Sequence, residues 1–262
     1  YYGESCPNPY LRVFPIKEVS DIGRKKGIPL IIDNTASPVI CKPLAHGAAV
    51  VMHSLTKYIG GHGTSIGGII VDGGNFDWIK DRKRQPLLNE PDQSYGGAIW
   101  TDAVPVLTGA NIPFIIRFRV VLLRDTGAPL APFNAWQIIQ GLETVGLRMK
   151  QHCANAEKVV TFLETQKKVQ NVIYPTNHQG EIKDRALRYM KGGYGSLVGM
   201  DVGTKENGAK FIDNLKMLYH VANIGDARSL AIHPATTTHS QLSEKELLAA
   251  GVTPGYVRLS IG

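Results

Sequence analysis

The chain has 262 residues, which at roughly 150 residues per domain suits one or two domains and is enough to bury a core without disulfides or structural metals. Hydrophobic residues make up 43% and charged residues 19%, which excludes a wholly disordered or fibrous protein. The net charge of +7 would suit an anionic ligand, but the basic residues are scattered and form no continuous stripe, so we expect no nucleic-acid binding.

The first predicted element is a helix over residues 15–26. Its apolar residues Ile16, Val19 and Ile22 recur at intervals of three. Pro15 suits the first helical position and Gly27 suits the C-terminal cap, so both ends of the helix carry the expected signals.

Two short apolar runs follow, over residues 28–33 and 48–53, and each ends in polar residues. Such runs are typical of strands that are buried on both faces of a parallel sheet. The 14 residues from 34 to 47 leave room for a crossover between them. The region therefore predicts an α/β unit.

Further along, the pattern becomes helical over residues 113–125 and again from Pro132 to Gly141. A long helix then carries one apolar stripe, spaced 4, 3, 4 and 3 residues apart, which predicts that Cys153 is a core residue and not a reactive thiol. The stripe consists of Met149, Cys153, Ala156, Val160 and Leu163.

A second α/β unit is predicted after the polar stretch that ends at Lys183. Ser243 and Glu246 have the spacing of a capping box at the start of its last helix. We place a domain boundary near residue 142, which divides the chain into domains 1–142 and 143–262. The predicted elements of the second unit are strand 195–202, helix 205–219, strand 227–232, helix 243–250 and strand 255–261.

Cysteines and hydropathy bear on the cellular compartment. Cys6, Cys41 and Cys153 leave one cysteine over in any pairing and lack the spacing of metal ligands, which favours a reducing cytoplasm. The most apolar stretch, residues 112–123, is far shorter than the roughly 20 residues of a membrane helix, so no membrane association is expected. The chain begins with neither a Met nor a leader pattern, and we expect it to be part of a longer polypeptide.

The densest chemical signal lies at the predicted strand ends. Asp33 follows the first strand and Lys57 the second, and open α/β sheets place their ligands at this carboxyl edge. Ser54 and Thr56 offer hydroxyls close to Lys57, which together with the backbone N–H groups of a tight turn suit a phosphate.

Other ligand classes fit less well. The glycines between residues 60 and 68 miss the dinucleotide spacing, and no Gly-Lys-Ser/Thr follows to make a P-loop, so we expect them to let the backbone turn tightly beside a bound group. The histidine pairs have neither zinc spacing nor clustered thiolates, and no metal site is predicted. These pairs are His46 with His53 and His233 with His239.

A lysine amine, a carboxylate and a phosphate site are together what pyridoxal phosphate (PLP) requires. The segment Asp33-Asn34-Thr35, taken with residues 54–63 (Ser-Leu-Thr-Lys-Tyr-Ile-Gly-Gly-His-Gly), resembles the signature of the Cys/Met-metabolism family of PLP-dependent enzymes. The similarity runs from Gly3 to the last residue. It implies a fold-type I PLP-dependent transferase of the α/β class, with a partial large domain on a mostly parallel sheet and a smaller C-terminal α/β domain.

The resemblance also implies roles for individual residues. Lys57 would bind the cofactor covalently and move protons, and Asp33 would pair with the ring nitrogen. The burial of Lys57 and a nearby positive charge would lower its pKa toward neutrality. The remaining assignments are Ser54 and Thr56 to the phosphate, Asn8 to the phenolic oxygen, and Arg258, with Ser229 beside it, to the substrate α-carboxylate.

Within the family, residues 71–78, 90–95, 130–134 and 225–230 most resemble the O-acetylhomoserine sulfhydrylases. This implies γ-replacement in methionine biosynthesis, in which O-acetyl-L-homoserine and sulfide give L-homocysteine and acetate. Alternatives are methionine γ-lyase or cystathionine γ-synthase activity, or a catalytically silent fragment that serves as an assembly module. The resemblance further implies a homotetramer built as a dimer of dimers, and it leads us to expect that the family's N-terminal phosphate loop and ring-stacking tyrosine precede Tyr1.

Overall fold

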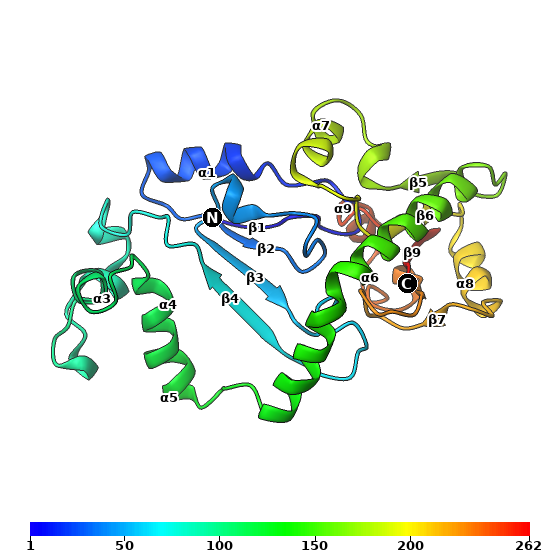
Figure 1. Cartoon of the computed structure of the whole chain (residues 1–262). Coiled ribbons are helices and arrows are strands. Elements are labelled where there is room, and N and C mark those ends of the chain that lie inside the picture. Colours follow the sequence, from blue (N-terminus) through cyan, green and yellow to red (C-terminus); the bar gives the residue numbers. More distant parts are fainter.

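The computed structural model describes residues 1–262, apart from the side chain of Glu244, and places two mixed sheets on either side of one long helix (Figure 1). In the first sheet β2 pairs in parallel with both β1 and β3, and β4 runs antiparallel to β3. The mostly parallel sheet is therefore confirmed. Its strands, in spatial order, are β1 (Tyr2–Glu4), β2 (Ile31–Asp33), β3 (Val50–Ser54) and β4 (Gly68–Asp72).

The two predicted strands form and pair as expected, although β2 is shorter than the apolar run that predicted it. Pro29 lacks the backbone N–H that a strand interior needs, and the ladder begins only at Ile31. Neighbouring residues point to opposite faces. Ile32 packs on the side of helix α1, and Ile31 packs against the cluster that contains Trp78. Both faces of β2 are thus covered, as predicted, whereas Ile69 and Val71 of the edge strand β4 are exposed.

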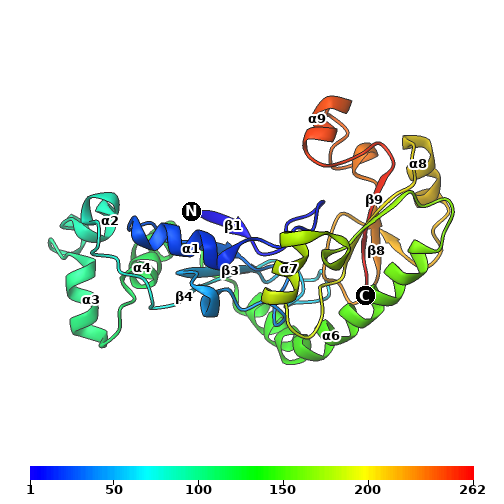
Figure 2. The same cartoon turned by 90° about the horizontal axis from the view of Figure 1, so that it is seen from above.

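Helix α1 (Ile16–Lys25) confirms the first predicted helix. It covers one face of the first sheet, and the helices between residues 86 and 126 lie beyond the other (Figures 1 and 2). The predicted helix over 113–125 is present but contains a π-helical stretch in its middle. The segments of this side are α2 (Pro86–Asn89), α3 (Trp100–Thr108), α4 (Pro113–Arg117), the π-helix Phe118–Leu123 and α5 (Arg124–Thr126).

The second sheet has the order β5-β6-β9-β8-β7 and is antiparallel except where β7 meets β8. The three predicted strands of this region and the capping box at Ser243 are confirmed. The helix predicted over 205–219 ends at Asp213, because the chain turns after Asn214 to enter β7. The elements are β5 (Asn171–Ile173), α7 (Gly180–Tyr189), β6 (Leu197–Asp201), α8 (Lys205–Asp213), β7 (Tyr219–His220), β8 (Leu230–Ile232), α9 (Glu244–Ala249) and β9 (Tyr256–Ser260).

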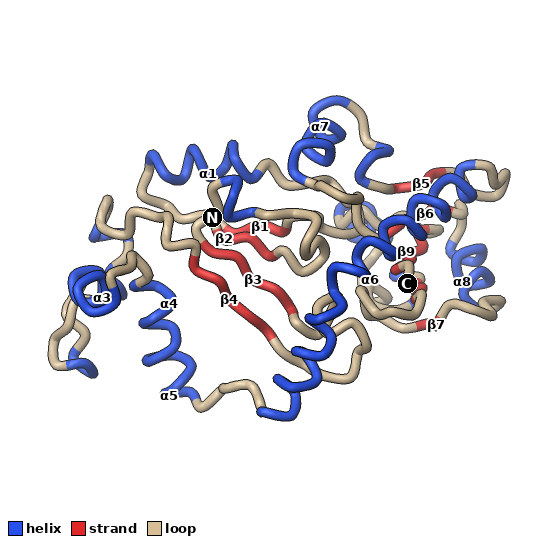
Figure 3. The backbone as a smooth tube through the Cα atoms, in the orientation of Figure 1, coloured by secondary structure: helices blue, strands red, loops and turns tan.

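Helix α6 (Pro132–Glu164) joins the two sheets and is continuous, where the sequence suggested one helix ending at Gly141 and another following it. The first half packs on the segment after β3, and the second half packs on the second sheet (Figures 1 and 3). All five residues of the predicted apolar stripe are buried, Cys153 among them. The boundary placed at residue 142 falls inside α6, and the division into two domains there stays a prediction.

Two glycines in α6 allow a matched test of this packing. A Cβ at Gly141 would lie 2.6 Å from the carbonyl oxygen of Ile59, whereas a Cβ at Gly146 would meet no atom within 4 Å. We expect Gly141→Ala to destabilise the protein by about 1–3 kcal/mol through overpacking. Gly146→Ala should stabilise it by about 0.5–1 kcal/mol, since alanine is the better helix former.

Urea unfolding of both variants, monitored by circular dichroism, measures the two effects. Equal midpoints for the two variants would contradict the proposed contact between α6 and the segment after β3.

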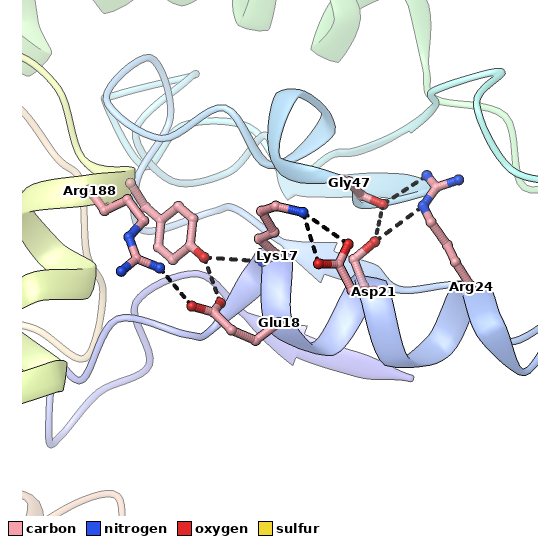
Figure 4. Close-up of polar contacts among 8 residues, drawn as sticks. Lys17, Glu18, Asp21, Arg24, Gly47 and Arg188 are labelled. Carbon is pink, nitrogen blue, oxygen red and sulfur yellow. Dashed lines mark hydrogen bonds and ion pairs between the residues drawn. The ribbon is translucent and has the colours of Figure 1, made fainter.

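A polar network joins α1 to α7 across the two halves of the chain (Figure 4). The Tyr189 hydroxyl donates to Glu18 Oε2 at 2.6 Å, and it accepts from the backbone N–H of Lys17 at 3.2 Å. Arg188 Nη1 donates to Glu18 Oε1 at 2.7 Å. The carboxylate of Glu18 therefore holds two neighbouring residues of α7.

The pH dependence of this contact follows from Glu18. Burial acts to raise the pKa of its carboxyl, but the hydrogen bond from Tyr189 and the charges of Arg188 and Arg185 outweigh burial and lower it. A lowered pKa in the folded state stabilises the protein above the ordinary glutamate pKa, and this stabilisation is lost as the pH falls below it. Because Glu18 is partly exposed, we expect Glu18→Gln to cost about 1 kcal/mol or less at pH 7.

The free energy of unfolding of wild type and Glu18→Gln, measured at neutral and at acidic pH, checks this. The difference between them should shrink toward acidic pH. Asp21→Asn, which removes an exposed ion pair with Lys17 on the same helix, is the control and should change little. A difference that does not depend on pH would contradict the assignment.

Among the described residues, no single helix has the length and apolar composition of a membrane span. The pair formed by residues 100–108 and 113–126, which meet at a bend of 100°, reaches that composition only when its two helices are taken together.

Candidate active site

The carboxyl ends of β2 and β3 lie side by side and carry two of the predicted site residues. Asp33 is the last residue of β2 and Ser54 the last of β3. Thr35 ties the two ends together: its backbone N–H donates to Asp33 Oδ1 at 2.8 Å, and its hydroxyl oxygen accepts from the backbone N–H of Ser54 at 2.7 Å. The expected clustering at this edge of the sheet is therefore present.

Lys57 lies in a tight turn directly after β3. Its backbone N–H donates to the Ser54 carbonyl at 3.2 Å, and its own carbonyl accepts from Gly61 N at 2.7 Å. A Cβ at Gly60 would stand 2.7 Å from the Leu55 carbonyl oxygen, and Gly61 has a φ of +75°, a conformation that favours glycine. The predicted tight turn of the glycine segment is confirmed.

Two sets of contacts hold this turn against the rest of the protein. Arg148 of α6 donates to the carbonyl oxygens of Tyr58 at 2.6 Å and Ile59 at 2.9 Å. The fully buried Tyr58 shares a hydrogen bond with Ser196 at 2.8 Å. The turn that carries Lys57 is therefore held from helix α6 and from the residue that precedes β6, which preorganises this segment.

The Lys57 amine meets residues from distant parts of the chain. Its Nζ donates to Asn223 Oδ1 at 2.5 Å. Arg258, on the central strand β9 of the second sheet, donates from Nη2 to the Asn223 carbonyl at 3.1 Å and from Nη1 to Asn8 Oδ1 at 3.3 Å. Three predicted residues, Lys57, Arg258 and Asn8, thus converge on one place.

The electrostatics of this place act on the lysine. Burial lowers the pKa of Lys57, and the positive charge of Arg258 lowers it further. Burial also lowers the pKa of Arg258. The pKa of Lys57 is therefore lowered, as the sequence suggested, and by the two causes it suggested.

Asp33 lies in a partly negative environment at the strand edge. It is the register partner of Glu4 on β1, and the Tyr2 hydroxyl donates to its Oδ2 at 3.4 Å. Burial raises the pKa of Glu4, and the neighbouring Asp33 raises it further. A cationic partner at this edge would relieve the repulsion between the two carboxyl groups.

Two predicted site hydroxyls have partners within the protein. Thr56 Oγ1 donates to the Gly67 carbonyl at 3.4 Å and accepts from the Gly67 N–H at 3.2 Å. Ser229 Oγ accepts from the N–H of Gly262 at 2.9 Å. The phosphate contact of Thr56 and the substrate contact of Ser229 stay predictions.

The sequence reasoning missed Asn223 and Arg148. Asn223 lies two residues before Gly225, just outside the segment 225–230 that resembles the O-acetylhomoserine sulfhydrylases. Arg148 lies in the middle of a helix whose apolar stripe drew attention to other positions. Neither has a local signal, because each acts on a turn far away in the sequence.

Among the described residues, no group of three or more His, Cys, Asp or Glu side chains is placed to hold a metal ion. His233, one of the histidines considered above, is buried and bonded to Thr236 and to the Pro254 carbonyl.

Comparison with known proteins identifies the family. The model of the Cys/Met metabolism PLP-dependent enzymes matches residues 1–262. The chain belongs to this family. Its members depend on PLP, and the motif around Lys57 agrees with the match.

Close relatives of this Cys/Met metabolism chain include two bacterial enzymes. The O-acetyl-L-homoserine sulfhydrylase of Leptospira meyeri is 48% identical over 100% of this chain and 60% of its own length. O-acetyl-L-homoserine sulfhydrylase 1 of Thermus thermophilus is 44% identical over 100% of this chain and 61% of its own. The chain thus spans about 60% of the length of these curated relatives.

Solved structures of Cys/Met metabolism enzymes show the same fold. A Campylobacter jejuni protein assigned as an O-acetylhomoserine (thiol)-lyase, which contains a pyridoxyl-lysine phosphate, is 38% identical and superposes with a TM-score of 0.90 over 100% of this chain and 61% of its own. Cystathionine γ-synthase from Xanthomonas oryzae pv. oryzae is 29% identical, with a TM-score of 0.75 over 100% of this chain and 58% of its own. The expected fold-type I PLP-dependent architecture is confirmed.

Proposed function

We propose that the protein of which this chain forms part binds PLP and replaces the γ-acetoxy group of O-acetyl-L-homoserine with sulfide. The observation that carries the proposal is the convergence of the Lys57 amine and the Arg258 guanidinium on Asn223, with Lys57 in the turn after β3, the parallel neighbour of the strand that ends at Asp33. Sulfhydrylases at 44–48% identity support the choice of reaction.

The residues at this edge fit the cofactor. Lys57 offers a half-buried amine whose pKa is lowered, which favours the neutral form that reacts with an aldehyde. Asp33 Oδ1 is bonded to Thr35, while Oδ2 has only the long contact with Tyr2 and is free to accept from a protonated ring nitrogen. We assign Ser54 and Thr56 to the phosphate and Asn8 to the phenolic oxygen.

When bound, PLP supplies an electron sink that stabilises negative charge on the carbons of an amino acid. Asp33 keeps a proton on the ring nitrogen and so sustains that sink. Arg258 binds the substrate α-carboxylate through its planar fork and orients the Cα–H bond toward Lys57. Lys57, once its amine is free, takes the proton from Cα and returns one later.

The overall reaction needs no redox partner. A C–S bond forms at Cγ, the C–O bond there breaks, and acetate leaves with the bonding electron pair. Sulfide brings the new nucleophile, so the products are L-homocysteine and acetate. We assign Ser229 to the substrate side of the site, next to Arg258.

Three further features belong to the proposal: a cytoplasmic location, a place in methionine biosynthesis and assembly as a dimer of dimers. The three free, buried cysteines support a reducing compartment. The division into a PLP-binding domain, 1–142, and a C-terminal domain, 143–262, is likewise proposed.

Steady-state assays of the full-length protein test the reaction. We expect homocysteine and acetate from O-acetyl-L-homoserine plus sulfide, and little turnover of methionine alone. Faster release of methanethiol from methionine, or faster reaction with cysteine as the sulfur donor, would replace the proposal with γ-lyase or cystathionine γ-synthase activity. A full-length protein without cofactor absorbance would favour the silent alternative.

A further inference from the structure

Asn223 occupies a place that the proposed roles leave unassigned. It comes from the loop between β7 and β8, and yet its side-chain oxygen contacts the Lys57 amine while its backbone carbonyl contacts Arg258. One residue therefore touches both the group assigned to proton transfer and the group assigned to carboxylate binding.

The loop that carries Asn223 is fixed on the lysine turn. Gly225 N donates to Ser260 Oγ at 3.1 Å, and Ala227 N donates to the Gly61 carbonyl at 2.9 Å. Gly225 has a φ of +71°, and a Cβ there would stand 2.6 Å from the backbone N of Tyr58. These contacts hold the backbone of the loop, two to four residues after Asn223, against the turn that carries Lys57.

The chemistry of the amide suits a positioning role. Oδ1 accepts one N–H of the lysine, while the nitrogen lone pair of the neutral amine stays available for a substrate proton. An amide carries no charge at any pH of interest, so it holds the amine without pairing it as a carboxylate would.

We propose that Asn223 is a positioning residue that holds the free Lys57 amine in place and couples it to Arg258. The inference rests on the proposed function and names how that site is organised. Because Arg258 binds the Asn223 carbonyl, a carboxylate that draws Arg258 toward itself also acts on the residue that holds Lys57.

A test of Asn223 must separate its effect on the pKa of Lys57 from the effects of charged groups in the surrounding elements. From β9, Arg258 faces it and lowers the pKa of Lys57, in addition to the effect of burial. Asp226, in the same loop as Asn223, is paired with Arg228 at 2.9 Å. Asp33 lies at the end of β2. These groups are unchanged in a variant at position 223.

Competitive labelling of the full-length protein without cofactor measures the effect directly. The protein is acetylated with trace acetic anhydride across a pH series, and peptide mass spectrometry gives the titration of Lys57. Asn223→Ala removes an acceptor that favours the charged amine, and should lower the pKa of Lys57 below wild type. Asn223→Asp keeps the shape and adds a negative charge, and should raise it above wild type.

The exposed Asn214→Ala is the control, since its side chain bonds only to the Lys210 carbonyl of its own helix, and it should leave the titration unchanged. In the PLP-loaded enzyme, Asn223→Ala should lower kcat by about 10- to 100-fold with a smaller change in KM. An unchanged Lys57 titration in Asn223→Asp, which is nearly isosteric and keeps the loop, would overturn the proposal even if Asn223→Ala failed to fold.

The labelling uses neither cofactor nor substrate. If the protein acts on another amino acid, the order of the three titrations still reports on Asn223. If the titrations coincide while O-acetyl-L-homoserine is turned over, only the positioning role is lost.

Discussion

Replacing Lys57 with alanine in the full-length, PLP-loaded protein is expected to lower kcat by about 10⁴-fold or more. Under the proposed function, the variant loses both the amine that binds the cofactor covalently and the base that moves the substrate proton. Steady-state kinetics measure the loss. Borohydride reduction of wild type, followed by peptide mass spectrometry, should place the pyridoxyl group on Lys57.

The control for this variant is Lys210→Ala, which removes an exposed lysine from α8 in the second half of the chain. It should retain wild-type kcat and borohydride labelling. Label on a different lysine, or kcat in Lys57→Ala close to that of wild type, would refute the assignment of Lys57 and with it the proposed site.

Asp33→Asn is expected to lower kcat by about 100-fold or more, because an amide cannot keep the ring nitrogen protonated by charge. The effect should fall on kcat more than on the KM for O-acetyl-L-homoserine, since Arg258 and Lys57 remain. Steady-state kinetics measure the loss in kcat, and absorbance spectra report the state of the bound cofactor.

Asp72→Asn is a closely matched control. Asp72 also ends a strand of the first sheet, and its Oδ1 accepts from Gly74 N at 2.9 Å, as Asp33 Oδ1 does from Thr35 N. It lies beside Val50, at the opposite end of β3 from Ser54. Equal losses in the two variants would mean that the strand-end turn matters and the position of the charge does not.

Much of the first sheet could be predicted because its signals are local. The apolar runs that end at Asp33 and before Lys57 lie within one strand, crossover and strand, and parallel strands bring their carboxyl ends to one edge. The apolar stripe through Cys153 could be predicted equally well, since its spacing depends only on the period of a single helix. Strand β5 was missed because it has only three residues, and β4, which is as long as β3, was missed because it follows directly on the glycine segment that predicts a turn.

The continuity of α6 shows a different limit. Gly141 suggested a helix end, but the structure places it where the helix passes within van der Waals distance of the lysine turn. The glycine is there for close approach and not for termination. A single sequence cannot separate these two uses, since both require only that the side chain be absent.

What the sequence alone determined is the chemical inventory of the site: an amine, a carboxylate and hydroxyls at neighbouring strand ends, together with the family to which they belong. What only the tertiary structure decided is which residues lie around the Lys57 amine. Asn223 lies 166 residues from Lys57 along the chain, and Arg258 reaches the same point from the second sheet. Local periodicity reports which residues are buried, but a contact across that separation depends on how α6 docks the two sheets together.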